Sequence, residues 1–380
     1  MTQTIEILAR LVGFPSVSST SNHDIIDYIE AFLKTRGFTL IRIADTAQPK
    51  AGLLAHIGPP GPGGIMLSGH SDVVPTAGQS WSSDAFTLRR ESTRLYGRGT
   101  TDMKGYLAAM LNAADLASTR NLKQPLKLAF SWDEEVGCLG IPQMLPHMAQ
   151  IGAPAMCFVG EPTGMNIATG HKGKIALTAT CHGTAGHSAN APDYLNALHL
   201  AADFITALRS VQSDLAQGPS DPAYDTPYST LHAGILTGGT ALNIVPDRAD
   251  ITFELRHLPA EDPAAILARL NSAAQTITAQ HPAAKITITQ TSAYPGLQTA
   301  PDAPVTTCAQ SLLPANTRLT KVAYGTEAGH ISASGIPTVV CGPGNMAQGH
   351  KADEFIEIDQ LAQCDAMLAA LIERLAAGSV

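Results

Sequence analysis

Cysteine, aromatic residues and basic charge are all scarce in this chain of 380 residues. The six cysteines stand singly with no Cys-x-x-Cys pair, which argues against a zinc ribbon or a disulfide framework and indicates buried thiols. Lysine and arginine number 24 against 32 aspartate and glutamate residues, so the basic excess of a nucleic-acid-binding protein is absent. The sequence also lacks an apolar run of about 20 residues and a signal-peptide pattern, so we expect a cytoplasmic protein with neither nucleic acid nor membrane as a partner.

Apolar residues are what the chain has in quantity. Hydrophobic residues make up 44% of the sequence and charged residues 15%, which is typical of a folded globular protein and excludes a largely disordered chain. At roughly 150 residues per domain, the length predicts about two to three domains. The net charge of −8 favours cations as ligands.

The first 160 residues alternate between strand and helix patterns. Short apolar runs bounded by glycine and proline predict strands at 38–43, 53–57, 65–68, 126–132 and 156–160. Apolar residues at helical spacing predict helices at 25–33, 103–116 and 143–149. The pattern resumes later, with helices at 305–313 and 359–377 and strands at 319–324 and 338–341. This alternation predicts an α/β fold, with a mixed, largely parallel sheet between helices.

A different order of elements separates the two stretches. The patterns predict strands at 174–181, 231–236, 249–255 and 285–291 and helices at 196–215 and 264–278. This βαββαβ order is that of a ferredoxin-like unit. We therefore predict a discontinuous domain of residues 1–173 and 295–380, with an inserted domain of residues 174–294.

Acidic and histidine residues gather near the ends of the predicted strands. They are His70, Asp72, Asp102, Glu134, Glu135, Glu161 and His350. All except Asp102, which opens a helix, follow a strand, and ligands of open α/β sheets collect at the carboxyl ends of strands. Two histidines with several carboxylates and no cysteine suit divalent ions such as Zn²⁺, in a number sufficient for two ions that share a carboxylate.

Two pairs in this set suggest a division of labour. Asp72 is two residues beyond His70 on an extended backbone, so it faces the same side and is placed to orient the imidazole. Of the adjacent Glu134 and Glu135, one can hold a metal ion while the other transfers a proton. The spacing does not decide which glutamate does which.

Competing catalytic motifs are incomplete. Residues 344–349 have the glycine spacing of a phosphate-binding loop, but His350 and Lys351 follow where lysine and serine or threonine are required. The sequence has neither a Gly-x-Ser-x-Gly nor a His-Glu-x-x-His motif. Phosphate transfer and serine-based hydrolysis are therefore disfavoured.

Five ordered segments resemble the motifs of the dinuclear metal amidohydrolases. They are Ser68–Pro75, Tyr96–Gly105, Asp133–Glu135, Gly160–Thr163 and Gly186–Ser188. This family includes acetylornithine deacetylase, succinyl-diaminopimelate desuccinylase, aminoacylase and glutamate carboxypeptidase. The resemblance implies a zinc aminopeptidase-like catalytic domain and a lid or dimerisation role for residues 174–294.

The resemblance also implies roles for single residues. It implies two divalent ions, zinc or cobalt, with the following ligands: His70 and Glu161 for one ion, Glu135 and His350 for the other, and Asp102 as the bridge. Glu134 matches the general base. His187 and Asn243 match residues that reach the carbonyl oxygen of the substrate, and that come from the partner subunit in dimeric members.

Two further residues are expected to bind substrate. Arg256 matches an arginine that holds the substrate carboxylate, for which its bidentate fork is well suited. Glu327 is expected either to face the side-chain ammonium of ornithine or to have a structural role. The segments at 51–57, 171–173, 325–328 and 342–344 are most similar to the acetylornithine deacetylase branch.

We therefore expect a homodimeric enzyme that hydrolyses the amide bond of an N-acyl-L-amino acid. The favoured substrate is N2-acetyl-L-ornithine, cleaved to L-ornithine and acetate in arginine biosynthesis. The alternatives are a related metallopeptidase or dipeptidase, a succinyl-diaminopimelate desuccinylase and, more remotely, a non-catalytic metal-binding module. A panel of substrates separates the hydrolases from one another, and the full set of ligands with a general base argues against the non-catalytic module.

Overall fold

The computed structural model describes residues 2–380, which form two compact units. Unit 1 comprises the described residues up to Gly170, with Leu297–Val322 and Thr326–Val380. Unit 2 comprises His171–Gly296 and the short segment Ala323–Gly325. The lid or dimerisation role of residues 174–294 stays a prediction.

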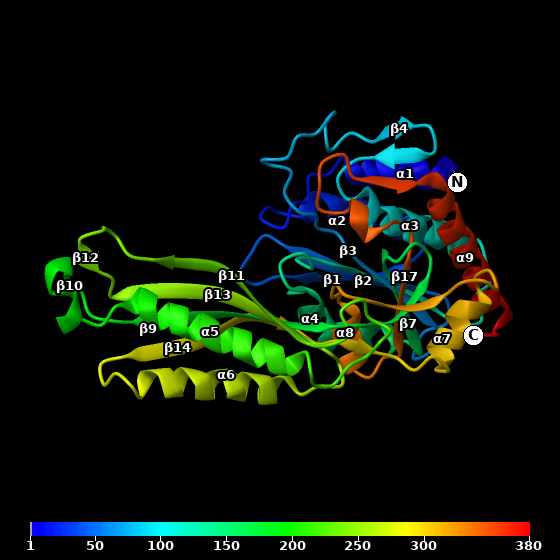
Figure 1. The fold of residues 1–380 in the computed structure, drawn as a ribbon. Coiled ribbons are helices and arrows are strands. Elements are labelled where there is room, and N and C mark those ends of the chain that lie inside the picture. Colours follow the sequence, from blue (N-terminus) through cyan, green and yellow to red (C-terminus); the bar gives the residue numbers. More distant parts are fainter. Residues whose placement is uncertain (1) are drawn as a thin grey trace. The chain divides into compact units, whose positions relative to one another are not determined.

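Unit 1 is built on one large sheet (Figure 1). Its strands are β1 (Thr39–Ala44), β2 (Ala51–Ile57), β3 (Ile65–His70), β6 (Leu126–Ser131), β7 (Met156–Pro162), β8 (Ile167–His171), β15 (Leu297–Gln298), β16 (Leu319–Val322) and β17 (Thr338–Gly342). They follow the order β1-β2-β6-β3-β7-β17-β8-β15, with β16 paired to β8. The pairs β6–β3, β3–β7 and β7–β17 are parallel, whereas β1–β2, β2–β6 and β17–β8 are antiparallel. The predicted mixed, largely parallel sheet is confirmed.

Helices cover this sheet. They are α1 (Thr2–Val12), α2 (His23–Lys34), α3 (Gly105–Ser118), α4 (Ile141–Met144), α7 (Pro304–Ser311), α8 (Ala328–Ala333) and α9 (Ile358–Ala377). α3 packs against β3 and β7, and also against α1 and α9. It is apolar and buried around nearly its whole circumference, as expected of a helix at the centre of a core. Gly160 of β7 allows this approach, because a Cβ atom there would lie 1.9 Å from the ring of Tyr106.

Alternate residues of β3 face opposite layers. Leu67 belongs to the core formed with α3, and a Cβ atom on Gly69 would meet Met103 and Leu107. Ser68, between them, donates a hydrogen bond to Glu327 at the start of α8. The period of two in a strand therefore places helices on both faces of the sheet, as the sequence predicts.

Unit 2 is an antiparallel sheet with two helices. Its strands are β9 (Gly173–His182), β11 (Thr230–Gly238), β13 (Arg248–His257) and β14 (Lys285–Tyr294), in the order β11-β13-β9-β14. α5 (Ala197–Leu215) and α6 (Pro263–Thr278) lie side by side along one face (Figure 1). Buried residues alternate along β9 and β13 and pack against these helices. The predicted βαββαβ unit is confirmed.

A few elements differ from the sequence-based expectation. α1, β8 and α8 are not predicted, and neither is the small sheet of β4 (Arg89–Glu91), β5 (Arg94–Tyr96) and β18 (Phe355–Glu357). Strands of three residues are too short to show a period. The helix predicted at 143–149 is α4 followed by a 3₁₀ helix over Leu145–Ile151, with Pro146 near the start of the second piece. Two-residue strands β10 (Gly186–His187) and β12 (Ile244–Val245) pair separately in unit 2.

Candidate metal centre

The predicted metal ligands come together at one edge of the unit 1 sheet. β3 ends at His70, β6 is followed by Glu134 and Glu135, and β7 carries Glu161 near its end. These strands are parallel neighbours, so their carboxyl ends meet at the same edge.

Asp102 lies between the two histidines of this edge. Its Oδ1 is 3.1 Å from Nε2 of His70, and its Oδ2 is 3.2 Å from Nε2 of His350. Burial raises the pKa of Asp102, but hydrogen bonds with His350 and His70 outweigh burial and hold that pKa well below its usual range. One oxygen directed to each imidazole is the arrangement required of a carboxylate shared by two cations.

Glu135 and Glu161 approach different histidines. Oε2 of Glu135 is 2.9 Å from Nε2 of His350, and Oε1 of Glu161 is 3.7 Å from Nε2 of His70. Within residues 2–380, ligand atoms lie within 4.8 Å of one another in two groups: His70 with Asp102 and Glu135, and His70 with Glu134 and Glu161.

One carboxylate oxygen of this cluster has no hydrogen-bond partner, and two of its carboxyl groups have raised pKa values. Oε1 of Glu161 is buried and has no hydrogen-bond partner in the part of the chain that the structure describes. Burial raises the pKa of Glu134 to about 8 and that of Glu135 to about 7, and nearby carboxylates contribute to both shifts. Such groups ionise readily when a divalent cation neutralises them, so this donor set of imidazoles and carboxylates fits divalent ions.

Asp72 contacts both His70 and the segment of the two glutamates. Its backbone oxygen is 2.9 Å from Nδ1 of His70, and its Oδ1 is 3.4 Å from the same nitrogen. Its carboxylate also accepts hydrogen bonds from the backbone N–H groups of Glu134 and Glu135, at 3.2 and 3.4 Å. Because Nδ1 is engaged, Nε2 of His70 is the nitrogen that faces the carboxylates.

Glu134 lies in a loop with an unusual backbone. Asp133 and Cys138 both adopt the left-handed region, with φ of 54° and 56°. Such conformations typically cost about 1–3 kcal/mol per residue, so the surrounding contacts must hold the loop in place. The thiol of Cys138 donates to Oε1 of Glu134 at 3.3 Å. The Glu134 carboxylate is therefore fixed beside the ligand cluster.

Two residues remote in sequence support this loop, and sequence reasoning did not find them. Nζ of Lys50 is 2.6 Å from Oδ1 of Asp133, with both side chains almost fully buried. The hydroxyl of Ser18 donates to Oδ2 of Asp72 at 2.7 Å. A single lysine before a strand and a single serine in a loop carry no sequence signal, because both are common on protein surfaces.

Glu327 does not have the environment expected of a substrate ligand. Its side chain is fully buried, and its two carboxylate oxygens accept hydrogen bonds from Ser68 and Ser131. Burial raises the pKa of Glu327 above its usual value. These contacts favour the structural role expected of Glu327, because its oxygens bind the two strands that lead to His70 and Glu134.

His187 and Asn243 are neighbours in unit 2. β10 pairs with β12, and the backbone N–H of Ser188 donates to the backbone oxygen of Asn243. Nδ1 of the exposed His187 accepts a hydrogen bond from the backbone N–H of Ala189 at 3.1 Å. The ring proton therefore sits on Nε2, which is a donor.

Arg256 lies far from that pair within unit 2. His187 and Asn243 are near the start of β13 at Arg248. Arg256 is eight residues further along the strand, or about 26 Å at the usual rise per residue. Nε of Arg256 is 2.7 Å from Oε1 of Glu254, whose other oxygen is 3.3 Å from Nζ of Lys174. The three residues predicted to contact the substrate from unit 2 do not converge within one copy of the unit.

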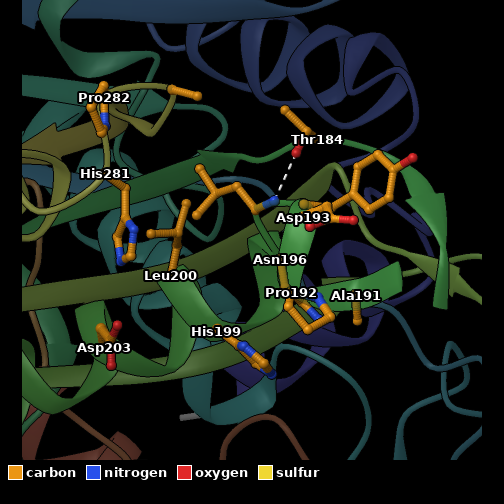
Figure 2. A pocket seen from close by; sticks show the side chains of 13 residues that line it. Thr184, Ala191, Pro192, Asp193, Asn196, His199, Leu200, Asp203, His281 and Pro282 are labelled. Atoms are coloured by element: carbon orange, nitrogen blue, oxygen red, sulfur yellow. Dashed lines mark hydrogen bonds between the residues drawn. The ribbon is translucent and has the colours of Figure 1, made fainter. Parts of the chain in front are cut away.

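A pocket of about 480 Å³ in unit 2 is distinct from the ligand cluster. Figure 2 shows His199 and Asp203 on α5 and His281 beyond α6 among its lining residues, with a hydrogen bond from the backbone of Leu195 to Thr184. None of its residues belongs to the two groups able to hold an ion, which lie in unit 1. We therefore place the chemistry at the unit 1 cluster.

Among residues 2–380, the structure has no helix both long and apolar enough to cross a membrane.

Known proteins are similar to this chain in sequence and in fold. A family profile described as Peptidase family M20/M25/M40 matches residues 66–374. Acetylornithine deacetylase of Proteus mirabilis (strain HI4320) is 31% identical over 376 residues, which cover 97% of this chain and 96% of that protein.

Two solved structures have the same fold. An M20 family metallo-carboxypeptidase, Sso-CP2 from Sulfolobus solfataricus, matches with a TM-score of 0.81 at 19% identity, over 99% of this chain and 100% of that chain. The Bacillus subtilis YXEP protein, described as a dinuclear metal binding peptidase from the M20 family, matches with a TM-score of 0.72 at 16% identity, over 98% of this chain and 97% of that chain.

The family match and the ligand cluster agree on the chemistry. The family profile spans the cluster from His70 to His350, and the donor set fits divalent cations. The protein is a metal-dependent amidohydrolase that uses divalent ions, as predicted from its sequence. The chain belongs to peptidase family M20/M25/M40.

Proposed function

We propose that the protein hydrolyses N2-acetyl-L-ornithine to L-ornithine and acetate, a reaction of arginine biosynthesis. The observation that carries the proposal is the cluster of two imidazoles and several buried carboxylates, with Glu134 beside it, in a chain that is 31% identical to an acetylornithine deacetylase over nearly its whole length. The site residues named below are part of this proposal.

Two divalent ions, zinc or cobalt, would occupy the cluster. His70 and Glu161 would hold one ion, Glu135 and His350 the other, and Asp102 both. When bound, the ions supply positive charge that polarises the amide carbonyl and acidifies the attacking water.

Glu134 would carry the proton. Its carboxylate lies within 4.8 Å of the ligand atoms of His70 and Glu161, and it accepts a hydrogen bond from Cys138. It takes a proton from the attacking water and delivers that proton to the leaving nitrogen. In the metal-free protein burial raises the pKa of Glu134 to about 8, and a neighbouring cation favours the carboxylate form that a general base requires.

Replacing this base tests its role. We expect Glu134→Gln to lower kcat by about 10²–10⁴-fold, because it removes the proton carrier and keeps the size of the side chain. Steady-state kinetics with a metal count on the same sample make the measurement. Cys138→Ser, which keeps a hydrogen-bond donor at the same place, is the matched control and should retain most of the activity. Wild-type turnover in Glu134→Gln with its metal bound would refute the assignment.

His187 and Asn243 would stabilise the oxyanion in the site of a partner subunit. Because Nδ1 of His187 accepts the N–H of Ala189, its Nε2 carries the proton and can donate to an oxyanion. The distance of about 26 Å between the ends of β13 prevents His187, Asn243 and Arg256 of one copy from contacting one small substrate. A homodimer in which each copy supplies His187 and Asn243 to the other, while Arg256 holds the substrate carboxylate, resolves this separation.

The reaction is tested by acetate release from N2-acetyl-L-ornithine. Metal-stripped protein is assayed before and after Zn²⁺ or Co²⁺ is added back, with a dipeptide and N-succinyl-L,L-diaminopimelate as parallel substrates. Metal-dependent release of acetate with the highest kcat/KM for the ornithine substrate supports the proposal. Faster cleavage of the dipeptide or the succinyl substrate overturns it and leaves the metal centre intact.

A further inference from the structure

A buried ion pair contacts the backbone of Asp102 but supplies no ligand to the cluster. Nη1 of Arg98 is 2.7 Å from Oε2 of Glu354, and each side chain is 1% exposed. Burying such a pair is costly unless further hydrogen bonds satisfy both ions, and removing one partner leaves the other charge uncompensated. The pair therefore needs an explanation in terms of what it holds.

The Glu354 carboxylate binds the backbone that carries Asp102. Its Oε1 accepts the N–H groups of Thr101 and Asp102 at 2.9 and 3.1 Å, and its Oε2 accepts the N–H of Gly99 at 3.0 Å. Gly99 has φ of 81°, a conformation that glycine adopts without strain. Three backbone donors and one guanidinium thus fix the peptide unit from which the Asp102 side chain extends.

The Arg98 guanidinium leads to the other ligand. Its Nη2 donates to Oε1 of Gln79, and Nε2 of Gln79 donates to the backbone oxygen of His350 at 2.9 Å. Nη1 also reaches the backbone oxygen of Lys351 at 3.4 Å. His350 needs this support, because its backbone has a left-handed φ of 62° and because its side chain, 51% exposed, is not held by burial.

His70 is held by different means. It ends the buried strand β3, and both its backbone neighbour Asp72 and the β6 and β7 strands position it. Neither Glu354 nor Arg98 contacts that strand by a hydrogen bond within residues 2–380. The ion pair is therefore linked to the His350 half of the cluster and to Asp102.

We propose that the Glu354–Arg98 pair is a positioning device for one of the two metal ions. It fixes the backbones of Asp102 and His350 relative to each other. Loss of the pair therefore weakens binding of the ion held by His350 and Glu135 more than binding of the ion held by His70 and Glu161. The inference rests on the ligand roles given under the proposed function. Partners of metal ligands typically contribute about 10–100-fold to metal affinity.

The test is a calorimetric titration of metal-stripped protein with Co²⁺ alone, paired with a thermal unfolding curve of the same sample. We expect the wild type to bind two ions. In Glu354→Gln one of the two affinities should fall by about 10–100-fold while the other is retained. Gln79→Leu, which alters a partly exposed residue and leaves the ion pair intact, should weaken the same ion by a smaller factor.

Lys127→Met is the matched control. Lys127 is also buried, but its Nζ donates to the backbone oxygens of Gly61, Gly63 and Ala153 at the other end of β6. This variant should unfold at a lower temperature and bind both ions with wild-type affinity. It separates the loss of a buried charge from the loss of a positioned ligand.

Four results would overturn the inference. Glu354→Gln with both wild-type affinities, or with both affinities lowered equally, would show that the pair has only a structural role. If Glu354→Gln does not fold, wild-type affinities in Gln79→Leu decide against it. A wild-type protein that binds no Co²⁺ overturns the proposed function as well, which distinguishes the two failures.

Discussion

At the scale of single residues, the environment of each carboxyl group in the cluster determines its pKa. Glu134, Glu135 and Asp102 are chemically alike, yet burial raises the pKa of the two glutamates while histidine partners lower that of Asp102. The difference follows from the charges that each group faces. A cation in the cluster replaces the protons that Glu134 and Glu135 otherwise retain near neutral pH.

The pH dependence of the stability of the metal-free protein measures these pKa shifts. The pKa of Glu134 in the folded protein is about 8 against an ordinary 4.5, so its stabilising contribution is complete below about pH 4.5 and is lost as the pH rises through 8. Glu135, with a pKa of about 7, and His350, with a pKa of about 10 against 6.5, shift stability in the same direction.

We therefore expect the melting temperature of the metal-free protein to fall between about pH 5.5 and pH 8, and to fall less in Glu134→Gln. Thermal unfolding in the presence of a chelator at both pH values makes the measurement. Added Zn²⁺ should remove most of the dependence, because it takes the place of the proton. An equal slope in the variant and the wild type would contradict this account.

Glu327 gives a second prediction at this scale. Glu327→Ala should destabilise the fold by about 1–3 kcal/mol for each serine hydroxyl left without a partner, because Ser68 and Ser131 are buried. The KM for N2-acetyl-L-ornithine should stay unchanged. Urea unfolding and steady-state kinetics on the same preparation check both statements. A raised KM with unchanged stability would restore Glu327 as a substrate ligand.

At the scale of elements, the pattern of the strands was the most informative part of the sequence. The parallel strands β3, β6 and β7 have apolar runs, and placing their polar successors at one sheet edge was enough to group His70, Glu134 and Glu161. The sequence also assigns Asp102 and His350 to this edge, but no periodicity predicts the contacts with Glu354 and Gln79 that hold their backbones. Glu327 shows the same limit, because its sequence leaves two roles open and its contacts come from Ser68 and Ser131 on other strands.

The β11 strand carries the element-scale prediction. It lies at the edge of the unit 2 sheet, and it exposes Ile235 and Leu236, while Leu242 and Ile244 are exposed just beyond it. An apolar edge strand of this kind favours pairing with another chain. Ile235→Lys, which places a charge on the edge, should shift the proposed homodimer towards monomer and lower activity.

Sedimentation or light scattering with a parallel activity assay tests this variant. Ile288→Lys on the opposite edge strand β14, a partly buried position packed on the unit 2 core, is a control for simple destabilisation. A dimeric and fully active Ile235→Lys protein would exclude the β11 edge from the interface.

At the scale of the whole molecule, the separation of His187 from Arg256 allows two inactive variants to complement each other. In a mixed dimer of Glu134→Gln and His187→Ala, one site receives Glu134 from one copy and His187 from the other. Random mixing makes half of the dimers mixed, each with one intact site, so about a quarter of the wild-type activity should return. Activity is measured before and after the two variants are unfolded together and refolded.

This experiment separates the two possible arrangements. If His187 acts in its own copy, the mixed dimer still lacks a complete site and activity stays at the level of the separate variants. Recovery in a mixture of Glu134→Gln with Asp102→Asn, which alter the same half of the site, is not expected and provides the control.

The insertion of unit 2 into unit 1 has a consequence for synthesis on the ribosome. β17, which lies between β7 and β8 in the sheet, His350 and Glu354 all follow unit 2 in the sequence. The nascent chain must therefore keep the first half of its sheet open while more than a hundred residues of another unit are translated, and contacts this distant in sequence form slowly. Until the last strand is inserted, the exposed edge of β7 is a site for mispairing, and the cluster cannot acquire its full set of ligands. Binding of the ion assigned to Glu135 and His350 therefore requires that translation has passed the end of the sheet.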